Sequence, residues 1–478
     1  MFINNEWVAS KSGKKIPVIN PATEEKIAEV DEAQKDDVEV AVATAKAAFQ
    51  LGSKWRTMDA SERGRLIYKL ADVLERDVYH IASLDSIDNG KPVTLALHDA
   101  QISVKTLRYF AGWADKTHGK TIPADGAVFS YARVEPVGVC GMITPWNFPL
   151  MIVVNKVAPA LAAGNTIVLK TSEKTPLSAL YLASLVKEVG FPPGVFNVLS
   201  GFGPTAGAPL ASHLDVDLVS FTGSTMVGKT IQKLAGESNA KRVKLEMGGK
   251  SPLVICDDAD LDLAVMIAHE GVMFNMGQSC IAASRTLVQE GIYDKFVAKA
   301  REMAIQRKRG DPFDPINVHG PQVDNIQFKK VLDYIEKGKK EGAKLEAGGK
   351  RFGSKGYFIE PTVFSNVSDD MVICKEEIFG PVQSILKFKT LDEAIKRSNA
   401  TEYGLAAGIV TKDNDRAVQF AQGVRAGMIW INTYTHVAPQ IPFGGFKMSG
   451  HGRELGEDAM NEYLEVKTVT MAISAKNS

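Results

Sequence analysis

Residues 138–170 read GVCGMITPWNFPLMIVVNKVAPALAAGNTIVLK, and a longer helical segment separates two short apolar runs in this stretch. A continuous apolar run of five or six residues predicts a strand that is buried on both faces of a sheet. A helix between two such strands is typical of a βαβ unit, in which the strands lie parallel. This stretch therefore predicts an α/β fold with a covered parallel sheet.

The same alternation continues to residue 257 and predicts a Rossmann-like domain. Its further strand-like runs are VFNVLS, LVSFTG, KLEMG and PLVICD, and helical segments lie between most of them. A second alternation runs from about residue 282 to residue 448 and predicts another α/β domain. Ahead of both, residues 36–113 show the apolar spacing of helices.

Two β-rich segments lie outside these alternations. Residues 122–138 (IPADGAVFSYARVEPVG) predict a hairpin excursion, and the tail YLEVKTVTMAI at 463–473 alternates polar and β-branched residues. An alternating segment at a chain end predicts an edge strand that needs a partner. We expect this partner to be the 120–137 excursion of another subunit.

Length and composition limit the classes of function. The chain has 478 residues, so two or three domains are expected. Its 56 basic and 56 acidic residues balance, which gives no bulk attraction to nucleic acid or to an anionic membrane. No apolar run approaches the roughly 20 residues of a membrane span, and no targeting segment is visible. The four cysteines are widely spaced, which disfavours disulfides and metal sites and favours a reducing, cytoplasmic compartment.

Two turns after predicted strands have the composition of a phosphate-binding site. VLSGFGPTAG places Gly201 and Gly203 directly after a strand, and FTGSTMVG places Gly223 and Ser224 between a strand and a helix. Small residues there let the N–H groups of a helix N-terminus face a pyrophosphate. An ordinary capped turn is the alternative for each motif alone, but two such turns in one parallel sheet favour a dinucleotide.

A charged segment follows the strand TIVLK. It contains Lys170 and Glu173, at the carboxyl edge where open sheets bind ligands. A carboxylate there accepts hydrogen bonds from ribose hydroxyls and repels a 2′-phosphate, which favours NAD over NADP. A solvated charged loop is the alternative.

Three residues have the chemistry of acyl transfer. Cys280 follows the polar, flexible run Gly277–Ser279, whereas Cys140, Cys256 and Cys374 lie in or beside apolar strands and read as core residues. A thiolate at Cys280 could attack a carbonyl carbon, provided that the local field lowers its pKa.

Glu246 and Asn147 complete this set. Glu246 ends an apolar strand just before two glycines, where burial would raise its pKa toward that of a general base; a surface carboxylate is the alternative. Asn147 offers an amide donor to an oxyanion, with simple turn formation as the alternative.

Six motifs occur in order along the whole chain: PWNFP (145–149), FTGSTxxG (221–228), LExGGKSP (245–252), GQxC (277–280), EEIFGPV (376–382) and PFGGxKMSGxGRELG (442–456). Together they resemble the aldehyde dehydrogenase superfamily, and most closely its cytosolic class-one, retinal-dehydrogenase-like branch. The resemblance implies an NAD-binding domain over 1–117 and 138–248. It also implies a catalytic domain over 249–448 and a small oligomerisation element over 118–137 and 460–478.

The resemblance also implies roles for individual residues. In the reaction, Cys280 would be the nucleophile, Asn147 and the Cys280 N–H would hold the oxyanion, Glu246 would activate water, and Lys156 and Glu454 would relay its proton. NAD would contact Lys170, Glu173, Gly203, Gly223, Ser224, Gln327, Lys330, Glu377, Phe379 and Trp146. The aldehyde would meet Phe148, Asn155, Phe274, Val437, Phe443 and Ile102. No metal is implied, and the assembly would be a dimer or tetramer of identical chains.

Several positions depart from the family pattern. Asn155 stands where relatives usually have a bulky Trp, Val437 is smaller than the aromatic residue of short-chain enzymes, and Ile102 is bulkier than the residue of retinal-type enzymes. Met226 and Thr171 also differ, near the cofactor path. We therefore expect NAD-dependent oxidation of an aldehyde to an acid in a tunnel of altered shape. The alternative is a weakly active or inactive structural protein on the same scaffold, similar to an enzyme-crystallin.

Overall fold

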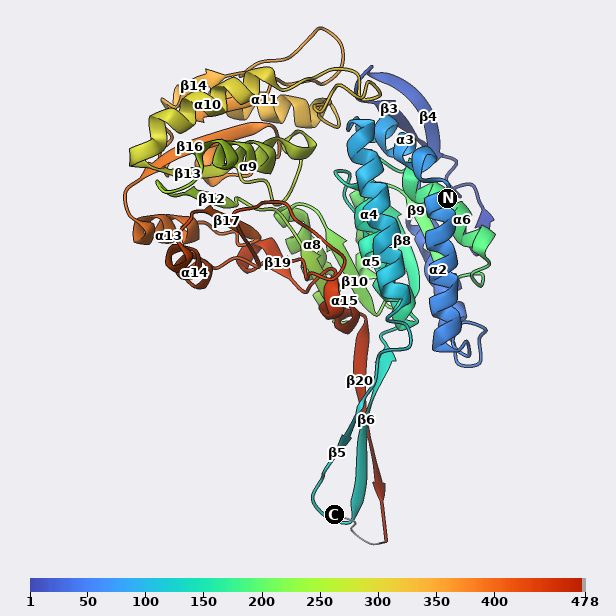
Figure 1. The fold of residues 1–478 in the computed structure, drawn as a ribbon. Helices are drawn as coiled ribbons and strands as arrows, with labels where there is room; N and C mark the ends of the chain where they lie inside the picture. Colours follow the sequence, from blue (N-terminus) through green and yellow to red (C-terminus); the bar gives the residue numbers. More distant parts are fainter. Residues whose placement is uncertain (475–478) are drawn as a thin grey trace.

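The computed structural model describes residues 1–474, which form two large α/β sheets, a protruding three-stranded arm and a two-stranded hairpin (Figure 1). The hairpin pairs β3 (Lys15–Asn20) with β4 (Glu25–Asp31). In the described part of the chain, no helix is long and apolar enough to span a membrane.

The first sheet has eight strands in the order β19-β11-β10-β7-β8-β9-β1-β2. These are β1 (Phe2–Ile3), β2 (Glu6–Trp7), β7 (Val139–Ile143), β8 (Thr166–Thr171), β9 (Phe196–Ser200), β10 (Leu218–Thr222), β11 (Arg242–Glu246) and β19 (Gly450–His451). The strands from β11 to β9 run parallel, whereas β1 and β19 are antiparallel to their neighbours. The predicted parallel sheet is therefore confirmed, with short antiparallel strands at its edges.

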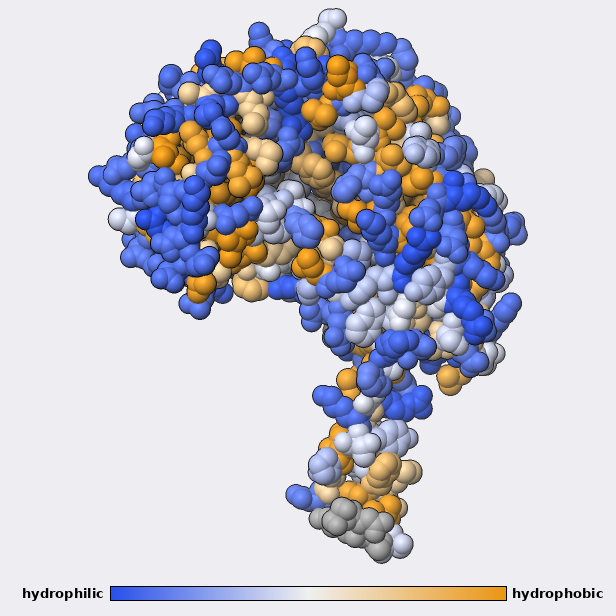
Figure 2. All heavy atoms as spheres, in the orientation of Figure 1, coloured by the Kyte–Doolittle hydropathy of each residue, from blue (hydrophilic) through white to orange (hydrophobic). Residues whose placement is uncertain are grey.

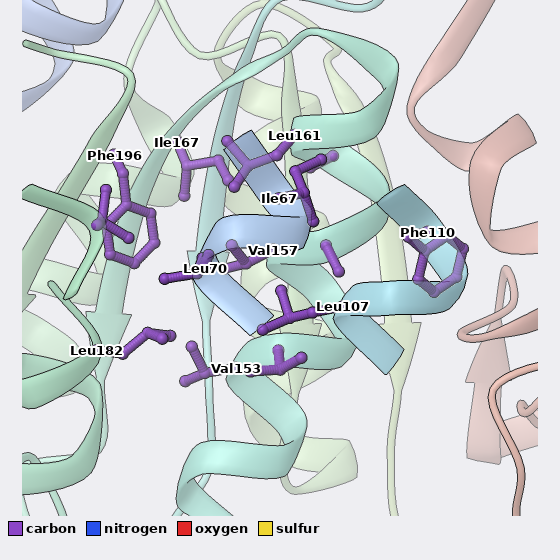
Figure 3. Close-up of a cluster of buried hydrophobic side chains, with 14 of the residues drawn as sticks. Ile67, Leu70, Leu107, Phe110, Val153, Val157, Leu161, Ile167, Leu182 and Phe196 are labelled. Carbon is purple, nitrogen blue, oxygen red and sulfur yellow. The ribbon is translucent and has the colours of Figure 1, made fainter. Parts of the chain in front are cut away.

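Helices cover both faces of this sheet. One face packs against α2 (Ala60–Arg76), α3 (Val78–Asn89), α4 (Val93–Ala111), α5 (Pro149–Ala163) and α6 (Leu177–Val189), and the other against α1 (Lys35–Phe49), α7 (Ala208–Ser212) and α8 (Thr225–Glu237). Along β8, Ile167 and Leu169 join the first core and Val168 joins the second. Figure 3 shows Ile167 facing Leu161 of α5 in the first core. Successive strand residues thus enter opposite cores, which explains the continuous apolar runs.

The second sheet has seven strands in the order β14-β15-β16-β13-β12-β17-β18. These are β12 (Pro252–Ile255), β13 (Arg285–Gln289), β14 (Lys344–Ala347), β15 (Thr362–Ser365), β16 (Val382–Phe388), β17 (Ala406–Val410) and β18 (Met428–Ile431). Its helices are α9 (Leu261–Met273), α10 (Tyr293–Gln306), α11 (Asn325–Lys340), α12 (Val372–Lys375), α13 (Leu391–Asn399) and α14 (Asn414–Gly423). Only β14 runs antiparallel to its neighbour, so the second predicted alternation is also confirmed.

The arm consists of β5 (Lys120–Ile122), β6 (Val128–Pro136) and β20 (Leu464–Ala472), and it projects away from the body (Figure 1). The expected partner of the tail was wrong in one respect, because β20 pairs antiparallel with β6 of the same chain along its whole length. The short helix α15 (Gly456–Glu462) and Tyr463 bring the chain back to the base of β6, which makes this pairing possible within one subunit. Apolar side chains remain exposed on the arm (Figure 2), among them Phe129, Val466 and Met471.

Other sequence predictions have mixed outcomes. The helical region 36–113 is confirmed as α1 to α4, and all four cysteines are free. Cys374, placed beside a strand from its sequence, instead lies buried in the short helix α12. The division of the chain into domains stays a prediction, and residues 475–478 of its last segment lie outside the described residues.

Candidate active site

The loop that carries Cys280 has an unusual backbone. Asn275 (φ 48°), Met276 (φ 56°) and Gly277 (φ 70°) are three consecutive residues with left-handed backbone geometry at the end of α9. A Cβ at Gly277 would collide with the Gly380 carbonyl, so only glycine fits there. Left-handed non-glycine residues are costly and concentrate at functional sites. Gly277, three positions before Cys280, is therefore required because its backbone lies close to that of Gly380.

A buried amide network fixes Asn147 beside this loop. The Asn147 side-chain amide donates to the Gln278 carbonyl at 3.1 Å. The Asn275 amide donates to the carbonyls of Asn147 (2.9 Å) and Gln278 (3.1 Å). The Gln278 Oε1 accepts from the Val323 N–H at 2.9 Å. These bonds hold the Asn147 amide against Gln278, two positions before Cys280 in the chain. The second N–H of this amide can then face an oxygen that reacts at the thiol.

Glu246 and Cys280 influence each other's protonation. Burial raises the pKa of Glu246 to about 7, and Cys280 and Lys156 only partly oppose this shift. Burial and the neighbouring Glu246 carboxylate raise the pKa of the Cys280 thiol well above its usual value. A lowered pKa was the condition set for a thiolate at Cys280, and the structure shifts the pKa in the opposite direction. The Glu246 carboxyl and the Cys280 thiol thus form one coupled, buried pair.

A buried charge cluster lies behind Glu246. The Lys156 Nζ is 2.6 Å from Glu454 and 3.0 Å from the Ser220 hydroxyl, while Lys244 is 2.9 Å from the other Glu454 oxygen. Burial alone would raise the pKa of Glu454, but the two lysines hold it below its usual value. The lowered pKa favours the ionised form of Glu454. Lys156 links the Glu454 carboxylate to the Ser220 hydroxyl within the core.

Two cavities meet at Cys280. The first, of about 170 Å³, lies toward the carboxyl ends of the first sheet's strands, and the second, of about 520 Å³, runs between α4, α5 and the loop 435–443. Thr222, Glu246 and Cys280 line both cavities. A group in the first cavity and a group in the second can thus approach the same sulfur atom.

The first cavity collects most residues predicted to bind the cofactor. Its lining includes Trp146, Gly223, Ser224, Gln327, Lys330, Glu377 and Phe379. Ser224 caps α8 by accepting from the Val227 N–H, which was the alternative interpretation of its motif, and its contact with a pyrophosphate stays a prediction. Gln327 donates its amide to the Phe379 carbonyl at 2.7 Å and thereby ties α11 to the loop that contains Glu377.

The other predicted cofactor residues lie apart from this cavity lining. Lys170 is buried in β8 with its Nζ 3.6 Å from Glu173, and burial lowers its pKa. Gly203 starts the π-helical turn η1 (Gly203–Gly207), with open space where a side chain would begin. Lys170 lies near the carboxyl end of β8 and Gly203 follows β9, so both are at the edge where α/β sheets bind ligands.

The second cavity contains every residue predicted to meet the aldehyde. Its lining includes Ile102, Phe148, Asn155, Phe274, Val437 and Phe443. The rings of Phe148 and Phe274 stack at 6.0 Å and form an apolar wall. An elongated, largely apolar molecule can therefore reach the Cys280 thiol from this side.

Comparisons with known proteins agree with this arrangement. Residues 7–469 match the model of the aldehyde dehydrogenase family. Human (Homo sapiens) aldehyde dehydrogenase 1A1 is 60% identical over 479 aligned positions, which cover 100% of this chain and 96% of that protein. Rat (Rattus norvegicus) aldehyde dehydrogenase, cytosolic 1, is also 60% identical, with the same coverage. An NAD⁺ complex of the Bacillus cereus aldehyde dehydrogenase has a TM-score of 0.97 and 49% identity, covering 99% of this chain and 96% of that one. The chain belongs to the aldehyde dehydrogenase family.

Sequence reasoning missed three residues of this aldehyde dehydrogenase. Lys244 shares Glu454 with Lys156, Asn275 holds the backbone of Asn147, and Thr222 faces both cavities. The spacing of Lys244 and Glu246 in one strand could have indicated that Lys244 lies near Glu246, because strand residues two positions apart point to the same face of a sheet. Asn275 carried a weaker signal, since asparagine tolerates left-handed geometry better than most residues.

Proposed function

We propose that this aldehyde dehydrogenase oxidises an aldehyde to a carboxylic acid with NAD, through a thioester on Cys280. The observation that carries the proposal is the position of Cys280 and Glu246, which both line the two cavities. One cavity has the polar lining of a cofactor site and the other has the apolar lining of a substrate site. A nucleophile and a base at their junction are what covalent aldehyde oxidation needs.

The residues present fit a dinucleotide. The N-terminus of α8 at Ser224 offers N–H groups to a phosphate, and Glu377 offers a carboxylate to sugar hydroxyls. A Cβ on Gly248 would lie 2.6 Å from the Glu377 carboxylate, so glycine makes room for this side chain. Glu173 beside Lys170 favours a ribose with free hydroxyls, and hence NAD over NADP. The Bacillus cereus relative is described as an NAD⁺ complex, which supports the same cofactor here.

The first step uses the coupled pair at the junction. Glu246 takes the proton from the Cys280 thiol, and the thiolate attacks the aldehyde carbon to form a thiohemiacetal. The Asn147 amide and the Cys280 N–H donate to the oxygen that becomes negative. One such donor contributes about 3–4 kcal/mol to transition-state stabilisation. NAD, when bound in the first cavity, would supply the acceptor for a hydride (two electrons and one proton) lost from the thiohemiacetal carbon.

The second step hydrolyses the thioester that remains on Cys280. Once Glu246 has released the proton that it took from Cys280, it deprotonates a water molecule; the hydroxide attacks the thioester carbonyl, and the Cys280 thiolate leaves as the acid forms. A base with a pKa of about 7 is suited to this task near neutral pH. We propose that Lys156 and Glu454 carry the proton away from Glu246, because they form the buried polar chain behind it.

The assembly and location are further proposals. The outer edges of β20 and β5 are unpaired in the described residues, and the arm exposes apolar side chains, which supports a dimer or tetramer of identical chains. The rat relative is named cytosolic, which supports a cytoplasmic location. No contact with nucleic acid or membrane is proposed.

The decisive experiment measures NADH formation with a panel of aldehydes for the wild-type enzyme and for Cys280→Ala. Wild-type activity and at least a thousandfold loss in the variant are expected, because no other group can form the thioester. The matched control is Cys256→Ala, which removes a buried thiol remote from both cavities and should keep the activity. Equal rates for the Cys280 variant and the wild type would refute the proposed nucleophile. A wild-type enzyme that neither forms NADH nor is stabilised by NAD against heat would instead favour the structural-protein alternative.

A further inference from the structure

The second cavity follows one face of α5. Met151, Ile152 and Asn155 are the half-buried residues of this helix, and the positions from 156 to 163 are buried. The spacing of three and four residues puts these side chains on one stripe, and all of them line the cavity. Asn155 is therefore the last residue of α5 that faces the cavity. It lies eight positions after Asn147, which precedes the helix.

The wall of this cavity is apolar around Asn155. Its apolar side chains include Ile102, Phe148, Met151, Ile152, Phe274 and Phe443. The polar groups of the inner end lie beside the thiol, among them Thr222, Glu246 and Glu454. Those of the mouth are exposed, among them His98, Lys105, His436 and Gln440. Between the two ends, Asn155 places one amide in the apolar wall.

This amide has no partner among the described residues. Its Oδ1 is buried and accepts no hydrogen bond from any of residues 1–474. The nearby polar side chains are committed elsewhere: the Thr435 hydroxyl donates to the Tyr434 carbonyl at 2.7 Å, and the buried Asp99 pairs with Lys91 at 2.6 Å. An amide can donate two hydrogen bonds and accept two, so Asn155 offers unused capacity to a molecule in the cavity.

We propose that Asn155 is a specificity-determining residue that selects aldehydes carrying a neutral hydroxyl group along the chain. The inference rests on the proposed aldehyde oxidation. A hydroxyl matches the amide, because its oxygen accepts from the NH₂ group and, after the side chain rotates, its proton is donated to the Oδ1 that is now buried without a partner. A carboxylate is a poorer match, since the Glu246 and Glu454 carboxyls lie at the inner end of the same cavity.

The apolar wall sharpens this selection. An unsubstituted aldehyde would displace water from Asn155 and leave its amide without any partner, which is unfavourable. A hydroxylated aldehyde of the same length would replace the lost water contacts while burying the rest of its chain against the wall. Discrimination therefore comes from the penalty on the wrong substrate as well as from the bond to the right one.

The test compares kcat/KM for ω-hydroxy and unsubstituted straight-chain aldehydes from hexanal to decanal, which are too long to close into small stable cyclic hemiacetals. The wild-type ratio of hydroxy to unsubstituted rates is expected to peak at one chain length. Asn155→Leu keeps the side-chain shape and removes the amide, and it should lower the peak ratio about tenfold. Asn155→Gln moves the amide by one methylene and should shift the peak to another length.

The control is Ile102→Leu, an apolar exchange in the same cavity, which should keep the ratio and its peak whatever the absolute rates. A flat wild-type ratio, or a ratio unchanged in Asn155→Leu while thermal melting shows a folded enzyme, would overturn the inference. An equal loss with both substrate classes would also overturn it, because Asn155 would then act on the common hydrolytic water. If no aldehyde yields NADH, the proposed function itself has failed, which is a distinct result.

Discussion

The Lys156 ammonium lies 2.6 Å from the Glu454 carboxylate, and both side chains are buried behind the proposed base. Removing one partner of a buried ion pair leaves an uncompensated charge and costs about 3–5 kcal/mol. Glu454→Gln should therefore destabilise the protein strongly, because it leaves both Lys156 and Lys244 without a carboxylate. Lys156→Met should cost less, since Lys244 still pairs with Glu454 at 2.9 Å.

Thermal melting and urea midpoints measure this ranking. The matched control is the exposed pair of Glu6 and Lys187, where Glu6→Gln should change stability by about 1 kcal/mol or less. A melting temperature for Glu454→Gln at or above that of Lys156→Met would contradict the ranking.

The pH dependence of turnover should report Glu246. Its carboxyl is active as a base when deprotonated, so the rate should rise as pH passes about 7 and level off above. Glu246→Gln should lower turnover roughly 10²–10⁴-fold and remove this rise. Steady-state rates from pH 5.5 to 9 test both points, and a variant with the wild-type pH profile would exclude Glu246 as the titrating base.

The same carboxyl should destabilise the folded protein at neutral pH. Its folded pKa of about 7 lies above the ordinary value of 4.5, so the unfolded chain releases this proton first as pH rises. Stability should consequently fall between about pH 4.5 and pH 7 and stay reduced above. Glu246→Gln removes this penalty, and its melting temperature at pH 8 should exceed that of the wild type. A lower value there would show that the Glu246 carboxylate has stabilising contacts that outweigh its burial.

Asn147→Ala should impair catalysis more than binding. Loss of one oxyanion donor typically lowers kcat about 10²–10³-fold. The Asn275 side chain still donates to the carbonyls of residue 147 and Gln278, so the loop should keep its shape. The heat stabilisation by NAD should remain close to that of the wild type, and a variant with near-normal kcat would remove Asn147 from the mechanism.

Glu173→Gln should relax the cofactor preference. The carboxylate repels the 2′-phosphate of NADP, and its removal leaves the buried cation Lys170 beside the ribose position. We expect kcat/KM with NADP to rise about tenfold while the value with NAD falls. Glu188→Gln, an exchange at an exposed carboxylate paired with Arg76, is the control and should alter neither value. Unchanged discrimination in Glu173→Gln would place the ribose elsewhere.

The sequence predicted much of this architecture because its signals are local. The βαβ pattern, the strand-to-helix turn at Ser224 and the apolar strand that ends at Glu246 each depend on neighbouring residues. The six motifs in order along the chain also identified the family correctly.

Features that depend on three-dimensional neighbours were harder to predict. The pKa of Cys280 rises because the thiol is buried and because Glu246, 34 positions earlier, is folded against it, and no local pattern encodes either condition. The need for glycine at position 277, which ends the left-handed run, comes from the Gly380 backbone, which is distant in the sequence. The subunit that supplies the partner of β20 was mispredicted because an alternating strand identifies its need for a neighbour but not which chain provides it.

The pairing of β6 with β20 in the arm also has a consequence during synthesis of the chain. Ser130 of β6 and Thr470 of β20 lie 3.0 Å apart in space and 340 positions apart in the chain. At about 5–20 residues per second, a ribosome needs on the order of tens of seconds to make the intervening polypeptide. Throughout that interval β6 has only the short strand β5 beside it, with one long edge open to other nascent chains. The synthesis of β20, rather than the folding of either large sheet, therefore determines when this edge is closed.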